Sequence, residues 1–131
     1  MDISILVSSP EPVYEQIVRQ IHEGVGSGLL APGTALPTVR QLADDLHINR
    51  NTVARAYKQL EDQGVIQTAG RKGTFVRNDA AKEVSLVKSG NAERSMRQMV
   101  GALLGDGWSR EQITALFDKA LQLASAQGNK S

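Results

Sequence analysis

The chain has 131 residues, of which 40% are hydrophobic and 22% charged, and its formal net charge is +1. A chain of this size can bury the core of one small domain with an appendage, and the absence of cysteine excludes disulfides, thiolate metal sites and cysteine nucleophiles. No apolar run approaches the roughly 20 residues that cross a bilayer, and the first residues lack the basic segment of a signal peptide, so the sequence predicts a cytoplasmic protein with no membrane partner.

The first predicted helix covers residues 12–27. Pro12 suits a first helical turn, because its missing N–H would be unpaired there anyway. The apolar residues that follow recur every four positions and form one stripe: Val13, Ile17, Ile21 and Val25. Gly24 and Gly26 each cost roughly 1 kcal/mol relative to alanine. We therefore expect the last turns of this helix to fray.

Two further helices are predicted, with a short break between them. Thr38 and Gln41 predict a capping box at the start of the second helix, in which each side chain pairs a free backbone N–H of the other residue. Asn49 can cap a third helix, and Gly64 predicts its end. Two helices with so short a connection form a helix-turn-helix.

A β-hairpin is predicted directly after the third helix. Residues 65–68 and 74–77 are rich in residues that favour strands. The connection, residues 69–73, contains two glycines, as a hairpin loop needs. A hairpin in this position is a wing, so the predicted fold is mainly α with a small β-hairpin: a winged helix-turn-helix domain over residues 1–77.

The remaining residues, 78–131, are predicted to form a linker and a two-helix dimerisation tail. Residues 78–90 are polar and mixed, which favours a linker or an irregular helix start, and an amphipathic helix follows over about residues 91–104. Ser109 and Gln112 predict a second capping box before a last helix to about residue 126, and the final five residues are expected to be disordered. The apolar residues expected to form the dimer interface are Met96, Met99, Val100, Leu103, Ile113, Leu116, Phe117 and Ala120.

The exposed side of the third helix is predicted to carry cations and an amide. Residues 38–78 contain seven basic and four acidic side chains, whereas residues 1–37 contain one basic and four acidic. At 100° per residue, the polar residues fall within an arc of about 140°: Arg50, Asn51, Arg55 and Lys58. The DNA major groove admits a helix, where arginine can pair with guanine and asparagine with adenine. The alternative is a solvated cationic face without a ligand, which a neighbouring capped helix and a basic wing make the weaker interpretation.

Other basic residues extend this surface. Arg71 and Lys72 lie at the predicted wing tip, where they can enter the minor groove or clamp phosphates. Arg40 lies early in the second helix, which usually crosses the DNA backbone, so we expect a phosphate contact. The alternative for Arg40 is an intramolecular ion pair with Asp44, one helical turn away.

An unbroken order of motifs runs from residue 12 to residue 77: Pro12–Ile17, Gly28–Gly33, Leu36–Ala43, Asn49–Val53, Leu60–Ile66 and Gly73–Val76. This order resembles the DNA-binding domain of the GntR family of transcription regulators. The resemblance implies dimers that bind palindromic operators, with DNA contacts from Arg40, Asn49, Arg50, Asn51, Thr52, Arg55, Gly70, Arg71, Lys72 and Gly73. The short tail resembles that of the YtrA subfamily, whose tail dimerises.

The sequence departs from the family's pattern at three places. His47 stands where the family commonly has glycine, although histidine tolerates a left-handed backbone better than most residues. Gly24 and Gly26 stand where alanine is more usual. Residues 88–91, Lys-Ser-Gly-Asn, can interrupt a tail helix that is continuous in relatives.

These features favour a sequence-specific regulator, a repressor that binds double-stranded DNA as a homodimer. A winged-helix protein-interaction module without DNA binding is the alternative. An enzyme is disfavoured, because the chain has no catalytic set and no cofactor lysine motif, and no cofactor is predicted. No metal site is predicted either, because His22 and His47 lie far apart without clustered ligands. The sequence identifies no small-molecule effector, which could act at the junction of domain and tail.

Overall fold

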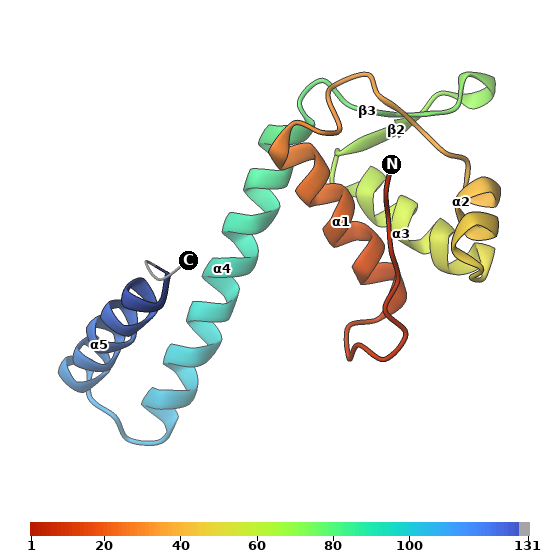
Figure 1. Cartoon of the computed structure of the whole chain (residues 1–131). Helices are drawn as coiled ribbons and strands as arrows, with labels where there is room; N and C mark the ends of the chain where they lie inside the picture. Colours follow the sequence, from red (N-terminus) through yellow and green to blue (C-terminus); the bar gives the residue numbers. More distant parts are fainter. Residues whose placement is uncertain (129–131) are drawn as a thin grey trace. The chain divides into compact units, whose positions relative to one another are not determined.

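The protein, described by a computed structural model over residues 1–128, divides into two compact units (Figure 1). The first comprises Met1–Lys88 and the second begins at Ser89. One helix, α4 (Ala80–Gly105), contributes to both. In the part of the chain that the structure describes, no helix is long and apolar enough to cross a membrane.

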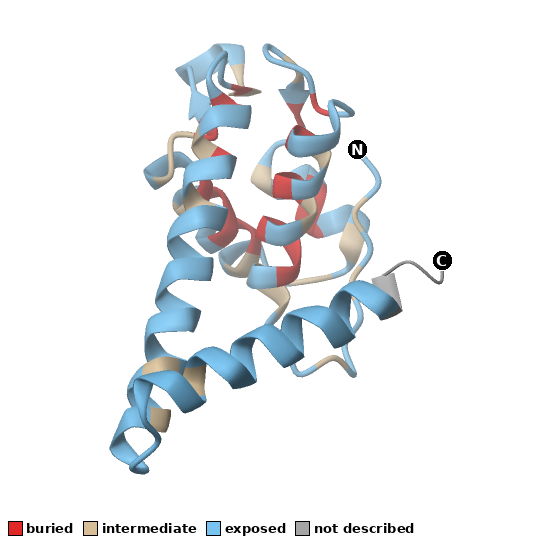
Figure 2. Cartoon of the chain, turned by 90° about the vertical axis from the view of Figure 1, so that its left-hand side faces the viewer, coloured by how far each residue is buried: buried red, intermediate tan, exposed pale blue. Residues whose placement is uncertain are grey.

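The first unit contains three complete helices: α1 (Val13–Ser27), α2 (Val39–Leu46) and α3 (Arg50–Asp62). Both α1 and α2 pack on α3, and Figure 2 shows buried residues on the inner faces of these helices. The largest fully buried side chains are aliphatic: Ile17, Ile21, Leu60, Ile66, Val53, Val65 and Val84. The predicted apolar stripe of the first helix and the buried side of the third therefore meet in one core.

A three-stranded antiparallel sheet closes this core, in the order β1-β3-β2. The predicted hairpin is confirmed as β2 (Ile66–Thr68) and β3 (Thr74–Val76). The short strand β1 (Ala35–Leu36) was not predicted, because two residues carry no periodic pattern. It pairs with β3, and the residues just before it are also held there, since the Val76 N–H donates to Thr34 O (3.0 Å) and the Gly33 N–H donates to Val76 O (2.8 Å).

The predicted helix starts are confirmed. The Gln41 N–H donates to Thr38 Oγ1 and the Thr38 N–H donates to Gln41 Oε1, each at 3.0 Å. Asn49 Oδ1 accepts from the Asn51 N–H at 2.7 Å. His47 takes the left-handed conformation between α2 and α3, with φ 57° and ψ 44°. The helix-turn-helix therefore forms with a histidine at its turn.

The first helix runs through both of its glycines to Ser27. A Cβ at Gly24 would lie 2.7 Å from Leu30 Cδ1, well inside contact distance. The Leu30 N–H also donates to Gly24 O (2.9 Å) as the chain turns back. Gly24 thus permits close packing of the following loop, which compensates for its weak helix propensity.

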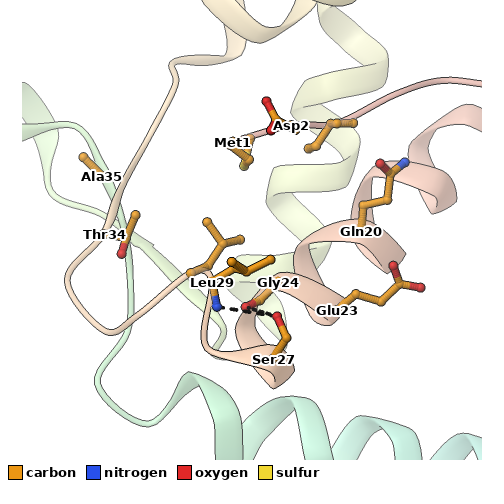
Figure 3. A pocket seen from close by; sticks show the side chains of 11 residues that line it. Met1, Asp2, Gln20, Glu23, Gly24, Ser27, Leu29, Thr34 and Ala35 are labelled. Carbon is orange, nitrogen blue, oxygen red and sulfur yellow. Dashed lines mark hydrogen bonds between the residues drawn. The ribbon is translucent and has the colours of Figure 1, made fainter.

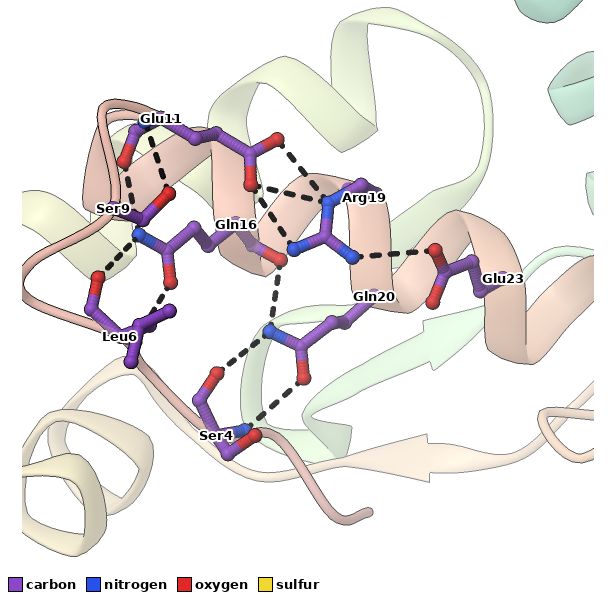
Figure 4. A network of polar contacts seen from close by, with 8 residues as sticks. All are labelled: Ser4, Leu6, Ser9, Glu11, Gln16, Arg19, Gln20 and Glu23. Atoms are coloured by element: carbon purple, nitrogen blue, oxygen red, sulfur yellow. Dashed lines mark hydrogen bonds and ion pairs between the residues drawn. The ribbon is translucent and has the colours of Figure 1, made fainter.

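An extended N-terminal arm lies along α1 and is held by two glutamines (Figure 4). Gln20 exchanges two hydrogen bonds with the backbone of Ser4, and Gln16 exchanges two with the backbone of Leu6. Four residues of helix rise about 6 Å and two residues of strand rise about 6.6 Å. This near match lets successive turns of α1 pair with alternate residues of the arm, and Ile3 and Ile5 pack against the core.

The tail differs from the prediction at its start. Residues 80–90, predicted as a linker or irregular start, are helical, and residues 88–91 do not interrupt α4. Ala80 and Val84, one helical turn apart, are buried in the first unit. Burial of these two side chains fixes the first turns of α4 and explains why a polar sequence is helical here.

The second unit consists of the C-terminal part of α4 and of α5 (Arg110–Gly128). The predicted second capping box is confirmed, since the Gln112 N–H donates to Ser109 Oγ (3.1 Å) and the Ser109 N–H to Gln112 Oε1 (2.9 Å). The helix α5 extends past residue 126 to Gly128. The rest of the predicted disordered end, residues 129–131, lies outside the described residues.

Candidate nucleic-acid interface

The helix α3 has one buried and one exposed side. Its apolar residues Val53, Ala56, Tyr57 and Leu60 are buried. Its predicted site residues Arg50, Asn51, Arg55 and Lys58 are exposed, as is the capping residue Asn49, while Thr52 is half-buried. The predicted two-sided character of this helix is therefore confirmed, and the polar strip is free of the core.

A buried tyrosine anchors α3 to the loop before α2. The Tyr57 hydroxyl donates to Pro37 O at 2.7 Å. Burial raises the pKa of this hydroxyl above its ordinary value, so it stays protonated and keeps donating. The anchor fixes the rotation of α3 and thereby the direction of its polar strip.

Two cations of α3, Arg55 and Lys58, have different neighbours. The guanidinium of Arg55 lies over the ring of Tyr14 on α1, with Cζ 3.8 Å from the ring centroid. The ammonium of Lys58 lies 3.3 Å from a carboxylate oxygen of Asp62, one turn later. Lys58 therefore has a competing carboxylate within its own helix, although an exposed pair of this kind is weak.

Arg40, on the first turn of α2, is exposed. Among residues 1–128, no ion pair joins it to Asp44. The intramolecular alternative for Arg40 is not realised here, and its guanidinium is available to a ligand.

The tip of the hairpin is a single 3-10 turn, Gly70–Lys72. Gly70 and Gly73 have φ of 55° and 97°, which favours glycine at both ends of the turn. The Ala69 N–H donates to Gly73 O (2.8 Å) and closes the loop, which leaves Arg71 and Lys72 exposed.

The hairpin is also fastened to α3, a link that the sequence did not reveal. The Thr68 hydroxyl donates to a carboxylate oxygen of Glu61 and lies 3.2 Å from the Thr74 hydroxyl across the hairpin. The Glu61 carboxylate thus ties the hairpin to the last turns of α3.

A second candidate site, a cavity of about 530 Å³, lies between the N-terminal arm and α1 (Figure 3). Leu29 and Leu30 supply apolar walls, and Asp2 and Glu23 supply carboxylates. None of the predicted DNA-contacting residues lines it. The cationic surface is therefore separate from this cavity.

The histidines do not form a metal site. In the described part of the chain, no three residues of histidine, aspartate or glutamate lie close enough to hold an ion. His22 is buried, and its Nε2 forms a 2.7 Å hydrogen bond with Gln63 Oε1 at the end of α3. Burial lowers the pKa of His22, which keeps its ring neutral.

The second unit brings together all eight residues predicted to form a dimer interface. They line one apolar groove of about 690 Å³ between α4 and α5, with Thr114 and Leu121. Several of these side chains are largely open, since Met99 is 63% exposed and Phe117 46%. Leu121 was missed because only the positions at the centre of the helical stripe were predicted.

The geometry defines a winged helix-turn-helix protein whose third helix presents a cationic strip. Residues 13–76 match the family described as "Bacterial regulatory proteins, gntR family". The chain is 37% identical over 98 residues to the HTH-type transcriptional repressor YtrA of Bacillus subtilis, covering 75% of each chain. The chain belongs to the GntR family, which confirms the resemblance, and it is a transcription regulator and not an enzyme.

Other relatives agree. The HTH-type transcriptional regulator Rv1152 of Mycobacterium tuberculosis is 49% identical over 70 residues, and the match spans 53% of this chain and 58% of that protein. A transcriptional regulator from Oenococcus oeni is 34% identical with a TM-score of 0.68, over 89% of this chain and 97% of the other. The DNA-binding domain of AraR, solved in complex with operator ORX1, is 26% identical with a TM-score of 0.52, over 58% and 98% of the chains.

Proposed function

We propose that this chain is a cytoplasmic, dimeric repressor that binds a palindromic DNA operator with α3 in the major groove. The observation that carries the proposal is the exposed strip of Arg50, Asn51 and Arg55 on a helix whose opposite side is buried. The structural similarity to the AraR domain, which was solved on an operator, supports DNA as the ligand.

The strip suits base recognition at the N-terminal end of α3. Residues at this end of a recognition helix reach deepest into the groove. Arg50 can donate two hydrogen bonds to guanine, and Asn51 can exchange two with adenine. Asn49 and Thr52 lie beside them, at the helix N-terminus, where backbone N–H groups favour a phosphate.

The remaining basic residues suit the sugar-phosphate backbone. Arg40 on α2 and Arg71 and Lys72 on the wing tip are exposed cations that flank α3 in the chain. Contacts to phosphate fix register and orientation but do not read the sequence. We assign Lys58 to this group as the weakest member, because Asp62 competes for its charge.

Dimerisation is assigned to the apolar groove of the second unit. Met99, Leu116 and Phe117 are between 40% and 63% exposed, and they line the groove with five further apolar residues of the predicted interface. Contiguous apolar surfaces of this kind usually mark an interface. A second copy would bury them, and a dimer would then present two copies of α3 to half-sites about 34 Å apart, one turn of DNA.

The proposal is tested by selecting bound fragments from the source genome and measuring their affinity by fluorescence anisotropy. We expect Arg50→Ala to weaken binding to the selected fragment by about 1–3 kcal/mol. Arg97→Ala is the matched control, because it removes the same charge from an exposed residue of the second unit. Binding without sequence preference, or equal affinity of the Arg50→Ala variant, would contradict the proposal and favour a protein-interaction module.

A further inference from the structure

Tyr14 lies on the first turn of α1, outside every segment to which DNA contact has been assigned. Its ring is half-buried and packs against the core. Its hydroxyl donates to Glu15 Oε1 at 3.0 Å. Its face receives the guanidinium of Arg55 from α3, at 3.8 Å from Cζ to the ring centroid.

The contact leaves the charge of Arg55 available. An aromatic ring attracts a cation through its quadrupole without supplying a negative charge. Within residues 1–128, Arg55 forms no ion pair, whereas Lys58 on the same helix lies 3.3 Å from Asp62. The N–H groups of a guanidinium point outward in its own plane, so stacking on a ring occupies its face and not its donors.

We propose that Tyr14 is a positioning residue that holds Arg55 ready for DNA and so makes α1 part of the DNA-binding machinery. An arginine that is ordered before binding loses less rotamer freedom when it pairs with a phosphate or a base. The inference rests on the proposed function, and it adds Tyr14 of α1 and its contact with Arg55 to the residues that serve DNA binding. Arg55 then ranks above Lys58 as a DNA-contacting cation.

The test is a double-mutant cycle on the genomic fragment with the highest affinity, measured by fluorescence anisotropy. Tyr14→Leu keeps an apolar side chain against the core but removes the ring, and we expect affinity to fall about two- to fivefold, the range of an exposed cation–π contact. Tyr14→Phe keeps the ring and should bind within twofold of the wild type. In an Arg55→Ala background, Tyr14→Leu should cause no further loss.

Three results would overturn the inference: no loss in Tyr14→Leu, an equal loss in Tyr14→Phe, or an undiminished effect of Tyr14→Leu when Arg55 is already alanine. Thermal unfolding of each variant, and the ring-current shift of the Arg55 side-chain protons by NMR, separate lost stacking from lost stability. Arg50→Ala separates the two proposals. If it weakens binding while Tyr14→Leu does not, only the inference fails; if neither does, the proposed function fails and the inference fails with it.

Discussion

At the scale of single residues, burial changes the pKa of a histidine on folding and so makes the stability depend on pH. His22 is buried beside Gln63, and burial lowers its pKa in the folded protein below the unfolded value of 6.5. The unfolded chain therefore binds a proton more readily, and folding stability is complete above pH 6.5 and falls as the pH drops below it. Acid should weaken the fold through this residue.

The free energy of unfolding, measured in urea between pH 7.5 and pH 5.5, checks this prediction. This range lies above the ordinary carboxylate pKa values of about 4, so carboxylates contribute little to the change. The wild type should lose stability across this range. The His22→Gln variant keeps an amide that can pair with Gln63 but cannot titrate, and its stability should change less. An equal pH dependence in the two proteins would remove His22 as the cause.

The residues of the candidate site were predictable where they depend on a local pattern. The helical arc of Arg50, Asn51 and Arg55 follows from 100° per residue alone, and the structure leaves all three exposed. The contact between Tyr14 and Arg55 was not predictable, because it joins two helices whose packing depends on the whole core. The link from Glu61 to Thr68 was missed because it joins α3 to a strand of the hairpin, whose placement also depends on tertiary packing.

At the scale of elements, the turn of the helix-turn-helix carries a measurable strain. His47 has φ 57°, a conformation that costs an L-residue roughly 1–2 kcal/mol. It is exposed, so replacing it sacrifices no buried packing. We expect His47→Gly to raise the free energy of unfolding by about 0.5–1 kcal/mol, since glycine's larger unfolded entropy cancels part of the gain.

Urea unfolding of the purified variant checks this expectation, and His47→Val is the opposite control. A β-branched residue is a poor fit to a left-handed turn, so this variant should be less stable than the wild type. A lower stability of His47→Gly would mean that the histidine ring contributes more than its backbone conformation costs.

The elements that sequence patterns missed depend on tertiary pairing. The caps of α2, α3 and α5 were predicted because each involves residues no more than three apart. The strand β1 exists only because β3 lies beside it. The start of α4 is fixed by burial of Ala80 and Val84 in the first unit. The sequence there has no periodic apolar pattern that would predict a helix.

At the scale of the whole molecule, the second unit lacks a core of its own. Among its described residues none is buried, and its apolar side chains line an open groove instead. The first unit has a full aliphatic core. This contrast explains why the tail was predictable as helices but not as a folded unit. In the dimer proposed above, a second copy of the chain would supply the surface that covers the groove.

We therefore expect Leu103→Asp, which places a charge in the groove, to give monomers in light scattering. Leu86→Asp is the matched control, because Leu86 is an exposed leucine of the same helix that lies in the first unit, outside the groove; it should remain dimeric. The monomer should also bind the selected fragment more weakly, since two linked half-sites bind far better than one. If Leu103→Asp stayed dimeric, the interface would lie elsewhere; if it became monomeric with unchanged affinity, DNA recognition would need only one copy of α3.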